Sequence, residues 1–281
     1  MLVIHHNDLD GRCAAAIVVL KYQGKIKESV QCAEVDYKDA DGFDVTRIQR
    51  NETVYIVDFS FKPEKMKEIT EVTKAIYWID HHKTAQRYEY TFEGLRDFSD
   101  KGAAGCELTW KFVMGNAPMP RPVALIGDYD AWRLKEAPES INFYEGLKLY
   151  SVNPHNQEFW VKLFSDETLM KTITEKGASG IQYRNQYVRH INGHYGYETE
   201  IGGHKAWACN IYAFGSAGLG DRFKNYPVSI SYIYDGHNYT VSLYSETVDV
   251  GEIAKKHGGG GHKGAAGFVT NVLPFVPSSR G

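Results

Sequence analysis

The sequence predicts an α/β protein with an N-terminal parallel-sheet domain, a helical connector and a smaller mixed α/β C-terminal domain. Three observations support this fold. Short apolar runs alternate with helical patterns through the first half of the chain, which is typical of a parallel sheet with helices on both faces. A long, mostly polar helical pattern follows, and beyond it apolar and polar residues alternate as they do in β-hairpins. The length of 281 residues suits one large or two medium domains.

The first domain is expected over residues 1–165. Strands are expected at the short apolar runs 2–6, 53–60 and 74–80. Helices are expected at 12–22, 63–73, 103–113 and 122–128. The second of these helices opens with Pro63, and proline suits the first turn of a helix because its fixed φ is already close to helical.

The connector is expected as one helix over residues 166–192, because the pattern there is helical and mostly polar. The C-terminal domain is expected over residues 193–281. Its alternating segments are 195–214 and 227–245. The second segment should fold as a hairpin around Asp235-Gly236, since this dipeptide favours tight turns.

The composition is that of a soluble globular protein, with 43% hydrophobic and 24% charged residues. The formal net charge of −3 argues against a protein that coats long nucleic acid, although placed cations or metals would still hold a small anionic substrate. The longest apolar run, Cys13 to Leu20, has eight residues and is too short to cross a bilayer. The N-terminus has no basic start and no signal core, so we expect a cytoplasmic protein without a membrane partner.

The four cysteines indicate neither a disulfide framework nor a zinc site, because they are widely scattered and no Cys-x-x-Cys pair occurs. They are Cys13, Cys32, Cys106 and Cys209. Metal-type residues of another kind follow three predicted strands. They occur in His6-Asn7-Asp8-Leu9-Asp10-Gly11, at Asp58, and in Asp80-His81-His82, with later acidic residues at Asp128 and Asp130. The carboxyl ends of parallel strands lie at one edge of a sheet, where ligands bind.

Each of these residues also has a purely structural interpretation. Asp10 precedes a predicted helix and could be its N-cap, Asp58 could belong to a turn, and Asp128 could cap the turn that follows it. His81 and His82 could be a surface pair. His5 should point to the opposite face from His6, because side chains alternate along a strand, so we assign it to packing or support.

Taken together, the structural interpretations weaken. Carboxylates and imidazoles gathered at one edge would repel one another or lie unsatisfied without a cation between them. Mixed aspartate and histidine ligation suits Mn²⁺ better than Ca²⁺, which prefers oxygen ligands alone. The residues are too many for one ion, and two ions about 3.5–4 Å apart are a known device for phosphoryl hydrolysis.

These residues resemble a known family. HNDLDG, VDFS, DHH and GD followed by YDAW, in this order, resemble the four motifs of the DHH phosphoesterase superfamily. GGGGHKGAAGF, residues 258–268, resembles the phosphate-gripping motif of the DHH-associated C-terminal domain. The resemblance covers nearly the whole chain, and five motifs in order are far more specific than any one alone. The most similar branch is that of the nano-RNases, or oligoribonucleases.

The resemblance implies roles for individual residues. Two divalent ions are implied, Mn²⁺ first, with Mg²⁺ or Co²⁺ as alternatives. The implied ligands are His6 and Asp8 for one ion, Asp10, His81 and Asp128 for the other, and Asp58 as the bridge. His82 and Asp58 are then the catalytic residues, because His82 would face the scissile phosphate and stabilise its charge or protonate the leaving oxygen.

Two more aspartates would support the ligands. Asp80 would orient His81 from behind. Asp130 is a rival for the role of Asp128. We prefer Asp128 because it follows Gly127 and stands four residues before Trp132, as expected of the fourth motif.

The glycine stretch would let the backbone approach a phosphate or a terminal nucleotide, with charge-assisted hydrogen bonds from the basic pair. The implied substrate-binding residues are Gly259, Gly260, Gly261, His262 and Lys263. A flexible linker is the alternative, but linkers rarely open directly into a packed segment such as AAGF. One departure concerns Tyr244, which follows Ser242-Leu243 where many members have arginine, and it puts the preferred substrate in question.

We therefore expect a metal-dependent phosphodiesterase that hydrolyses very short single-stranded RNA to mononucleotides, with its active site in the cleft between the two domains. A cleft closed at one end by a phosphate grip would favour short substrates. Alternatives are hydrolysis of 3′-phosphoadenosine 5′-phosphate, a linear or cyclic dinucleotide, or polyphosphate, and a nucleotide-binding module without catalysis. Tyr244 or Trp132 could stack a base, although core packing is the usual role of such rings. Cleavage polarity and oligomeric state, with a homodimer as one option, stay open.

Overall fold

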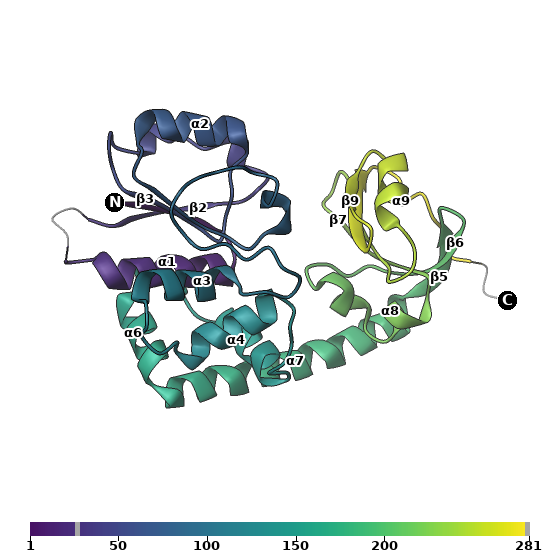
Figure 1. Cartoon of the computed structure of the whole chain (residues 1–281). Coiled ribbons are helices and arrows are strands. Elements are labelled where there is room, and N and C mark those ends of the chain that lie inside the picture. Colours follow the sequence, from purple (N-terminus) through teal and green to yellow (C-terminus); the bar gives the residue numbers. More distant parts are fainter. Residues whose placement is uncertain (26–28, 279–281) are drawn as a thin grey trace. The chain divides into compact units, whose positions relative to one another are not determined.

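The computed structural model describes residues 1–25 and 29–278 (Figure 1). The chain divides into two compact units, Met1–Ile181 and Gln182–Gly281. Helix α7 (Glu167–Tyr195) contains the boundary between them. The expected connector at 166–192 is therefore one continuous helix whose first half belongs to one unit and whose second half belongs to the other.

The N-terminal unit is built on a four-stranded sheet in which every pair of neighbouring strands is parallel. In spatial order the strands are β2 (Gln31–Val35), β1 (Leu2–His6), β3 (Val54–Val57) and β4 (Ile76–Ile79). The parallel sheet predicted from the alternation of patterns is confirmed. Strand β2 was not predicted, because as an edge strand it buries only Ala33 and Val35 fully and its sequence carries little apolar signal.

Helices cover both faces of this sheet (Figure 1). On one face, Val3 and Val57 pack in a core with helix α1 (Leu9–Tyr22), which is buried along most of its length because it consists largely of small and apolar residues. On the other face, Ile4 and Ile56 pack with helix α2 (Pro63–Val72). Four further helices are α3 (Gly105–Met114), α4 (Arg121–Asp130), α5 (Glu139–Leu147) and α6 (Gln157–Ser165).

The C-terminal unit contains a mixed six-stranded sheet in the order β5-β6-β7-β8-β10-β9. Its strands are β5 (Tyr197–Ile201), β6 (His204–Cys209), β7 (Val228–Tyr234), β8 (Tyr239–Tyr244), β9 (Gly260–His262) and β10 (Ala265–Thr270), with the short helices α8 (Arg222–Asn225) and α9 (Val250–Lys256). Both predicted hairpins are confirmed, since β5 with β6 and β7 with β8 pair antiparallel. At the second turn, Oδ1 of Asp235 accepts the N–H groups of His237 and Asn238 at 2.8 and 2.7 Å.

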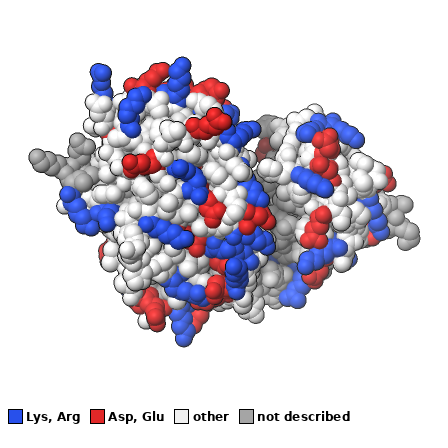
Figure 2. Space-filling model, in the orientation of Figure 1, with Lys and Arg blue, Asp and Glu red and all other residues white. Residues whose placement is uncertain are grey.

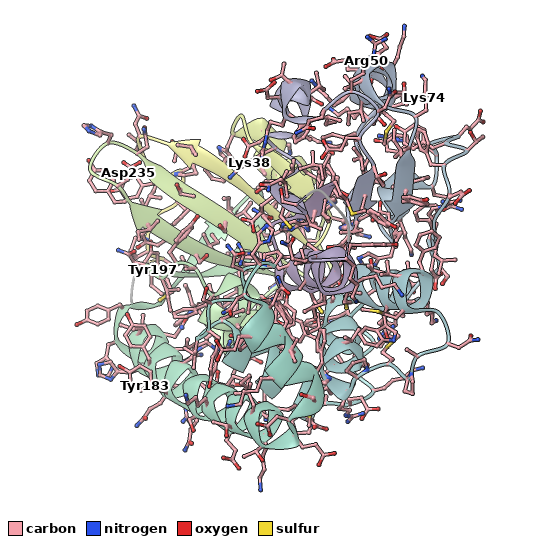
Figure 3. All side chains as sticks on the ribbon, turned by 90° about the vertical axis from the view of Figure 1, so that its left-hand side faces the viewer. Lys38, Arg50, Lys74, Tyr183, Tyr197 and Asp235 are labelled. Carbon is pink, nitrogen blue, oxygen red and sulfur yellow. The ribbon has the colours of Figure 1, made fainter. Side chains whose placement is uncertain are left out.

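The charged side chains form no large field of one sign on the face that Figure 2 shows, where acidic and basic groups are interspersed. In Figure 3, Arg50 and Lys74 project from the N-terminal unit, and Tyr183 projects from α7 with 74% of its side chain exposed. None of the helices in residues 1–25 and 29–278 has the length and apolar character needed to cross a membrane.

Candidate metal centre

The loop between β1 and α1 holds two aspartates in different ways. Asp8 is the N-cap of α1, with extended backbone and Oδ1 accepting the N–H of Gly11 at 2.8 Å. The structural alternative for Asp10, that it is the N-cap, is wrong, because Asp10 lies inside the first turn. Its carboxylate is fully buried and accepts the N–H groups of Gly105 and Cys106 at 2.7 and 2.8 Å, which ties α1 to the start of α3.

Asp58 follows β3 with a positive φ of 53°, and its side chain is fully buried. Neither of its carboxylate oxygens has a hydrogen-bond partner among the described residues. Gly105 lies so close that an added Cβ would stand 2.5 Å from Cβ of Asp58, so only glycine fits there. Burial, and then the carboxylate of Asp10, raise the pKa of Asp58 well above its usual value of 3.8. A buried carboxylate without a partner is what a bound cation would satisfy.

Two histidines point at Asp58 from different strands. Nε2 of His81, which follows β4, lies 3.1 Å from Oδ1 of Asp58 and has no hydrogen-bond partner among the described residues. Nδ1 of His6, at the end of β1, lies 3.8 Å from Oδ2 of Asp58 and 2.7 Å from Oδ2 of Asp8. Burial alone would raise the pKa of Asp8, but the hydrogen bond and charge of His6 and the N–H of Gly11 act together with its other neighbours to lower the pKa to about 2.

Asp130 completes the cluster at the end of α4. Its Oδ2 lies 3.3 Å from Nε2 of His81, which is also 3.6 Å from Oδ2 of Asp10. Burial, and then the charge of Asp10, raise the pKa of Asp130 well above its usual value. Within the described residues, three groups place their ligand atoms within 4.8 Å of one another: His6 with Asp8 and Asp58, Asp10 with His81 and Asp130, and Asp58 with His81 and His82.

In the structure Asp130, and not the preferred Asp128, lies in this cluster. The two oxygens of Asp128 accept the backbone N–H groups of Lys135 and Glu136, each at 3.0 Å, and the guanidinium of Arg133 lies 3.7 Å away. Asp128 therefore closes the turn after α4. Two residues along an α-helix are separated by about 200°, so Asp130 faces the cluster when Asp128 faces this turn.

The end of α4, which carries these aspartates, is held by a partly buried ion pair. The guanidinium of Arg133 donates to both carboxylate oxygens of Glu107 on α3, at 2.9 and 3.0 Å, and to the carbonyl of Gly102 at 2.6 Å. The sequence reasoning missed both partners. Bidentate pairing of this kind holds geometry as well as charge, so the pair positions the end of α4 against α3.

Asp80 holds His82, whereas the sequence led us to expect it behind His81. Oδ1 of Asp80 accepts Nδ1–H of His82 at 2.7 Å. Its other oxygen accepts the hydroxyl of Ser60, which in turn accepts Nε1–H of Trp78 at 2.9 Å. Burial would lower the pKa of His82, but the hydrogen bond to Asp80 and the charges of Asp80, Asp8 and Asp10 together outweigh burial and raise the pKa. Because Nδ1 is engaged, Nε2 is the ring atom of His82 that remains for a ligand.

His5 points away from the cluster, as expected from the alternation along β1. It is buried, and its Nδ1 lies 2.7 Å from the carbonyl oxygen of His6. Burial lowers the pKa of His5, which keeps this ring neutral. Ser60 belongs to the VDFS motif but received no role from the sequence, although a hydroxyl two residues after a candidate ligand was a usable signal.

In the C-terminal unit, the glycine stretch is part of the sheet, so its interpretation as a flexible linker is wrong. Gly260–His262 forms β9 and pairs antiparallel with β10. A Cβ added to Gly261, whose φ is +141°, would stand 2.5 Å from Cα of Ala266, so glycine is needed for close packing on β10. Gly260 faces open space, while His262 and Lys263 are exposed. A substrate role for Gly259, Gly260, Gly261, His262 and Lys263 stays a prediction.

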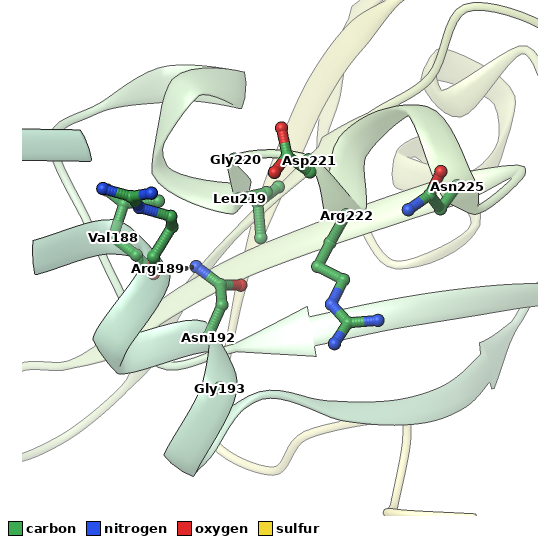
Figure 4. A pocket seen from close by; sticks show the side chains of 9 residues that line it. All are labelled: Val188, Arg189, Asn192, Gly193, Leu219, Gly220, Asp221, Arg222 and Asn225. Atoms are coloured by element: carbon green, nitrogen blue, oxygen red, sulfur yellow. Dashed lines mark hydrogen bonds between the residues drawn. The ribbon is translucent and has the colours of Figure 1, made fainter. Parts of the chain in front are cut away.

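The C-terminal unit also has a polar pocket of about 230 Å³ that shares no residue with the glycine stretch (Figure 4). Asn192 fixes its wall, because its Nδ2 donates to the carbonyls of Val188 and Gly218, each at 2.9 Å. Tyr244, considered for base stacking, packs partly buried against a cluster that includes Trp207. Trp132, the other candidate, is 57% exposed.

Comparison with known families identifies the first part of the chain. Residues 1–128 match the model of the DHH family, N-terminal domain. The N-terminal domain belongs to the DHH family. The resemblance seen in the sequence is thereby confirmed, and with it the class of phosphoesterase-type hydrolases to which the sequence assigned the chain. The match ends at Asp128, so it includes three of the four aspartate- and histidine-bearing motifs completely.

Two curated proteins are similar in sequence. The uncharacterized protein R106 of Acanthamoeba polyphaga mimivirus is 28% identical over 246 residues, which cover 80% of this chain and 56% of that protein. The chain thus spans little more than half of this relative. Oligoribonuclease NrnB of Bacillus subtilis (strain 168) is 21% identical over 300 residues, which cover 93% of this chain and 71% of that protein.

Two solved structures share the fold of this DHH protein. The pGpG-specific phosphodiesterase PggH of Vibrio cholerae has a TM-score of 0.61 at 13% identity, covering 96% of this chain and 93% of that chain. An exonuclease RecJ bound to manganese has a TM-score of 0.52 at 14% identity, covering 96% of this chain and 85% of that chain. These alignments extend over both units, so the predicted fold of a DHH domain with a C-terminal domain is confirmed.

Proposed function

We propose that the chain is a metal-dependent phosphodiesterase that hydrolyses very short oligonucleotides to mononucleotides with two divalent ions. The observation that carries this proposal is the buried carboxylate of Asp58, which lacks hydrogen-bond partners and lies between two groups of ligand atoms. The donor set of carboxylate oxygens and imidazole nitrogens suits Mn²⁺ or Mg²⁺. The manganese-bound RecJ, which has a similar fold, supports Mn²⁺ as the first choice.

The residues divide between two ions that share one ligand. His6 and Asp8 would hold one ion, Asp10, His81 and Asp130 the other, and Asp58 both. When bound, such ions neutralise the charge of the phosphodiester and lower the pKa of coordinated water. Asp10 is also held by two backbone N–H groups, so its oxygens are already oriented before any ion binds.

His82 is the residue we propose to act on the leaving group. Its Nδ1 is held by Asp80, and Asp80 is held by the hydroxyl of Ser60, so the ring has a fixed direction. Its pKa is raised above the usual value for histidine, which favours the protonated ring. A protonated Nε2 would stabilise the charge of the scissile phosphate and protonate the departing oxygen.

The C-terminal unit would select for length. We propose that His262 and Lys263, exposed at and beside the edge strand β9, bind the far phosphate or nucleotide of the substrate. A substrate held at both ends must be short. The oligoribonuclease NrnB and the pGpG-specific phosphodiesterase PggH, similar in sequence or in fold, both have names that support a short oligonucleotide as substrate.

The similarity to PggH also favours a narrower alternative, in which a linear dinucleotide is the preferred substrate. A length series of labelled RNA, from two to about twenty nucleotides, separates the two. Each RNA is incubated with Mn²⁺, with Mg²⁺ and with a chelator. We expect metal-dependent release of mononucleotides from the shortest RNAs and a decline with length. Activity confined to dinucleotides supports the alternative, and equal rates at every length contradict the proposal of length selection.

A further inference from the structure

An aromatic pair borders the metal centre on the side of His6 and His82. Tyr37 follows the edge strand β2, and its ring stacks on that of Phe59 with 4.5 Å between centroids and 28° between planes. Phe59 is fully buried and packs in turn on Phe61, at 5.0 Å between centroids. Tyr37 thus has a rigid aromatic support behind one face of its ring.

Tyr37 keeps part of its surface exposed. It is 38% exposed, although Phe59 stacks on one face of its ring and the rings of His6 and His82 lie beside it. Within the described residues of the N-terminal unit, most other aromatic rings near the sheet are buried in the two cores. A large exposed ring beside a cluster of buried carboxylates is available to a ligand.

The ring lies within reach of whatever binds at the metal centre. Its centroid is 5.3 Å from the ring centroid of His6 and 5.3 Å from that of His82. The two histidine rings stand 5.6 Å apart, so the three rings form one cluster beside the carboxylates. A ligand that contacts His82 therefore lies within a few ångströms of Tyr37.

The backbone around Tyr37 is fixed by its neighbour Asp36. Oδ1 of Asp36 accepts the N–H of Lys38, and Oδ2 accepts Nδ2–H of Asn7, both at 3.1 Å. Asn7 stands between the ligands His6 and Asp8, so this bond ties the end of β2 to the metal loop. The position of the segment that carries Tyr37 is therefore fixed relative to the loop that contains His6 and Asp8.

We propose that Tyr37, supported by Phe59, forms a binding platform for the nucleobase next to the scissile phosphate. The proposal rests on the proposed phosphodiesterase function and names a specificity residue for it. Stacking on an aromatic face is tolerant of base identity, because every base presents a π-face. The platform thus selects for a base at this position and discriminates little among the four bases.

The test compares Tyr37→Leu with Tyr37→Phe, which keeps the ring and removes the hydroxyl. The substrates are the RNA dinucleotide ApA and matched dinucleotides in which one nucleoside is abasic. We expect Tyr37→Leu to lower kcat/KM on ApA by about ten- to a hundredfold, mainly through KM, and to leave the rate unchanged when the abasic position is the one beside the platform. Tyr37→Phe should behave like the wild type. The control variant is Tyr183→Leu, at a tyrosine on α7 with 74% exposure, which should change neither substrate.

Binding of products gives a readout that does not need turnover. Calorimetry with Mn²⁺ compares adenosine 5′-monophosphate with ribose 5-phosphate, and manganese content is measured in every variant. We expect the wild type and Tyr37→Phe, but not Tyr37→Leu, to prefer the nucleotide. If no oligonucleotide is cleaved, the proposed function is wrong. The preference for adenosine 5′-monophosphate over ribose 5-phosphate still tests whether Tyr37 binds a base. Three outcomes would overturn the inference. Tyr37→Leu could lose the same activity on ApA and on the abasic dinucleotide, or it could lose manganese. Tyr37→Phe could also lose as much activity as Tyr37→Leu.

Discussion

Nδ1 of His82 donates a hydrogen bond to Oδ1 of Asp80 at 2.7 Å. This bond fixes the ring of His82, whereas the adjacent His81 turns Nε2 toward Asp58 at 3.1 Å. Two neighbouring histidines thus have different surroundings. His82 is held by one carboxylate, whereas His81 faces three. Removing one or the other histidine should therefore affect different properties of the protein.

The first prediction separates these two histidines. His81→Ala should lower metal occupancy, because it removes the nitrogen at the meeting point of Asp10, Asp58 and Asp130. His82→Ala should retain both metals and lower kcat by about a hundred- to ten-thousandfold. Elemental analysis and steady-state kinetics measure the two effects. His155→Ala, at an exposed loop residue, is the control, and equal loss of metal from both variants would contradict the assignment.

The second prediction concerns Asp58. Asp58→Asn keeps the shape of the side chain and removes the charge that would hold two cations close together. We expect Mn²⁺-dependent activity to fall by about three orders of magnitude or more while the fold is retained. The metal-free variant should melt at a higher temperature than the metal-free wild type. The substitution removes the cost of burying a carboxylate and the repulsion between this carboxylate and Asp10. Calorimetric titration with Mn²⁺ checks both sites, and substantial turnover in this variant would refute the shared ligand.

The third prediction distinguishes Asp130 from Asp128. Asp130→Asn should weaken metal binding and leave the metal-free melting temperature unchanged or raised, since the pKa of Asp130 is raised by burial. Asp128→Asn should retain metal and lower stability by about 1–3 kcal/mol, because its carboxylate accepts two backbone N–H groups. Denaturant unfolding and manganese content are measured on both variants. The reverse pattern would restore Asp128 as the ligand.

The fourth prediction is a pH dependence of the metal-free protein. The folded-state pKa values of Asp58 and Asp130 are raised above 3.8, so the native state binds protons that the unfolded state has released. The free energy of unfolding should therefore fall as pH rises from about 4 through those pKa values. The raised pKa of His82 acts in the same direction, since its contribution is present below about pH 6.5 and is lost as pH rises through its folded-state value.

The lowered pKa of Asp80 changes stability in the opposite direction. Its contribution to the free energy of unfolding is present above about pH 3.8 and is lost only as pH falls through a value below 3.8. The lowered pKa of His5 also acts in the opposite direction, but its contribution is complete above about pH 6.5. Above this pH we therefore expect the melting temperature without metal to decrease as pH rises. Mn²⁺ should flatten or reverse this slope, because metal and protons compete for the same carboxylates. Calorimetric scans at a series of pH values test this, and Asp58→Asn should show a shallower slope. A metal-free protein that becomes more stable with rising pH would argue against repulsion among these groups.

The fifth prediction concerns His262, on the edge strand β9. If it binds the far end of the substrate, His262→Ala should lower kcat/KM on di- to pentanucleotides by about ten- to a hundredfold, the value of a charge-assisted hydrogen bond. A small nitrophenyl phosphodiester is too short to reach this residue, so its hydrolysis should change little. Lys224→Ala, at an exposed residue elsewhere in the C-terminal unit, is the matched control. Equal losses on both substrates would assign His262 to the reaction centre or to the fold.

The sequence by itself determined the parallel sheet, the helices α1 to α4 and most of the residues that gather in the aspartate–histidine cluster. This was possible because both signals are local. A buried parallel strand must be apolar throughout, as Val54–Val57 is, and a ligand at the edge of such a sheet must follow the last apolar residue directly, as Asp58 does. The hairpin at Asp235 was equally local, since the turn is made by the dipeptide itself.

Only the tertiary structure decided which neighbouring side chains meet. Asp128 and Asp130 are equivalent by type, but the helical rotation between them sends one to the turn at Lys135 and the other to His81. Asp80 similarly reaches His82 instead of His81. Tyr37 lies beside His82, but the edge strand that it follows carries little apolar signal of its own. In each case the outcome depends on the directions of side chains in space, which are set by packing between elements far apart in the chain and leave no periodic pattern in the sequence.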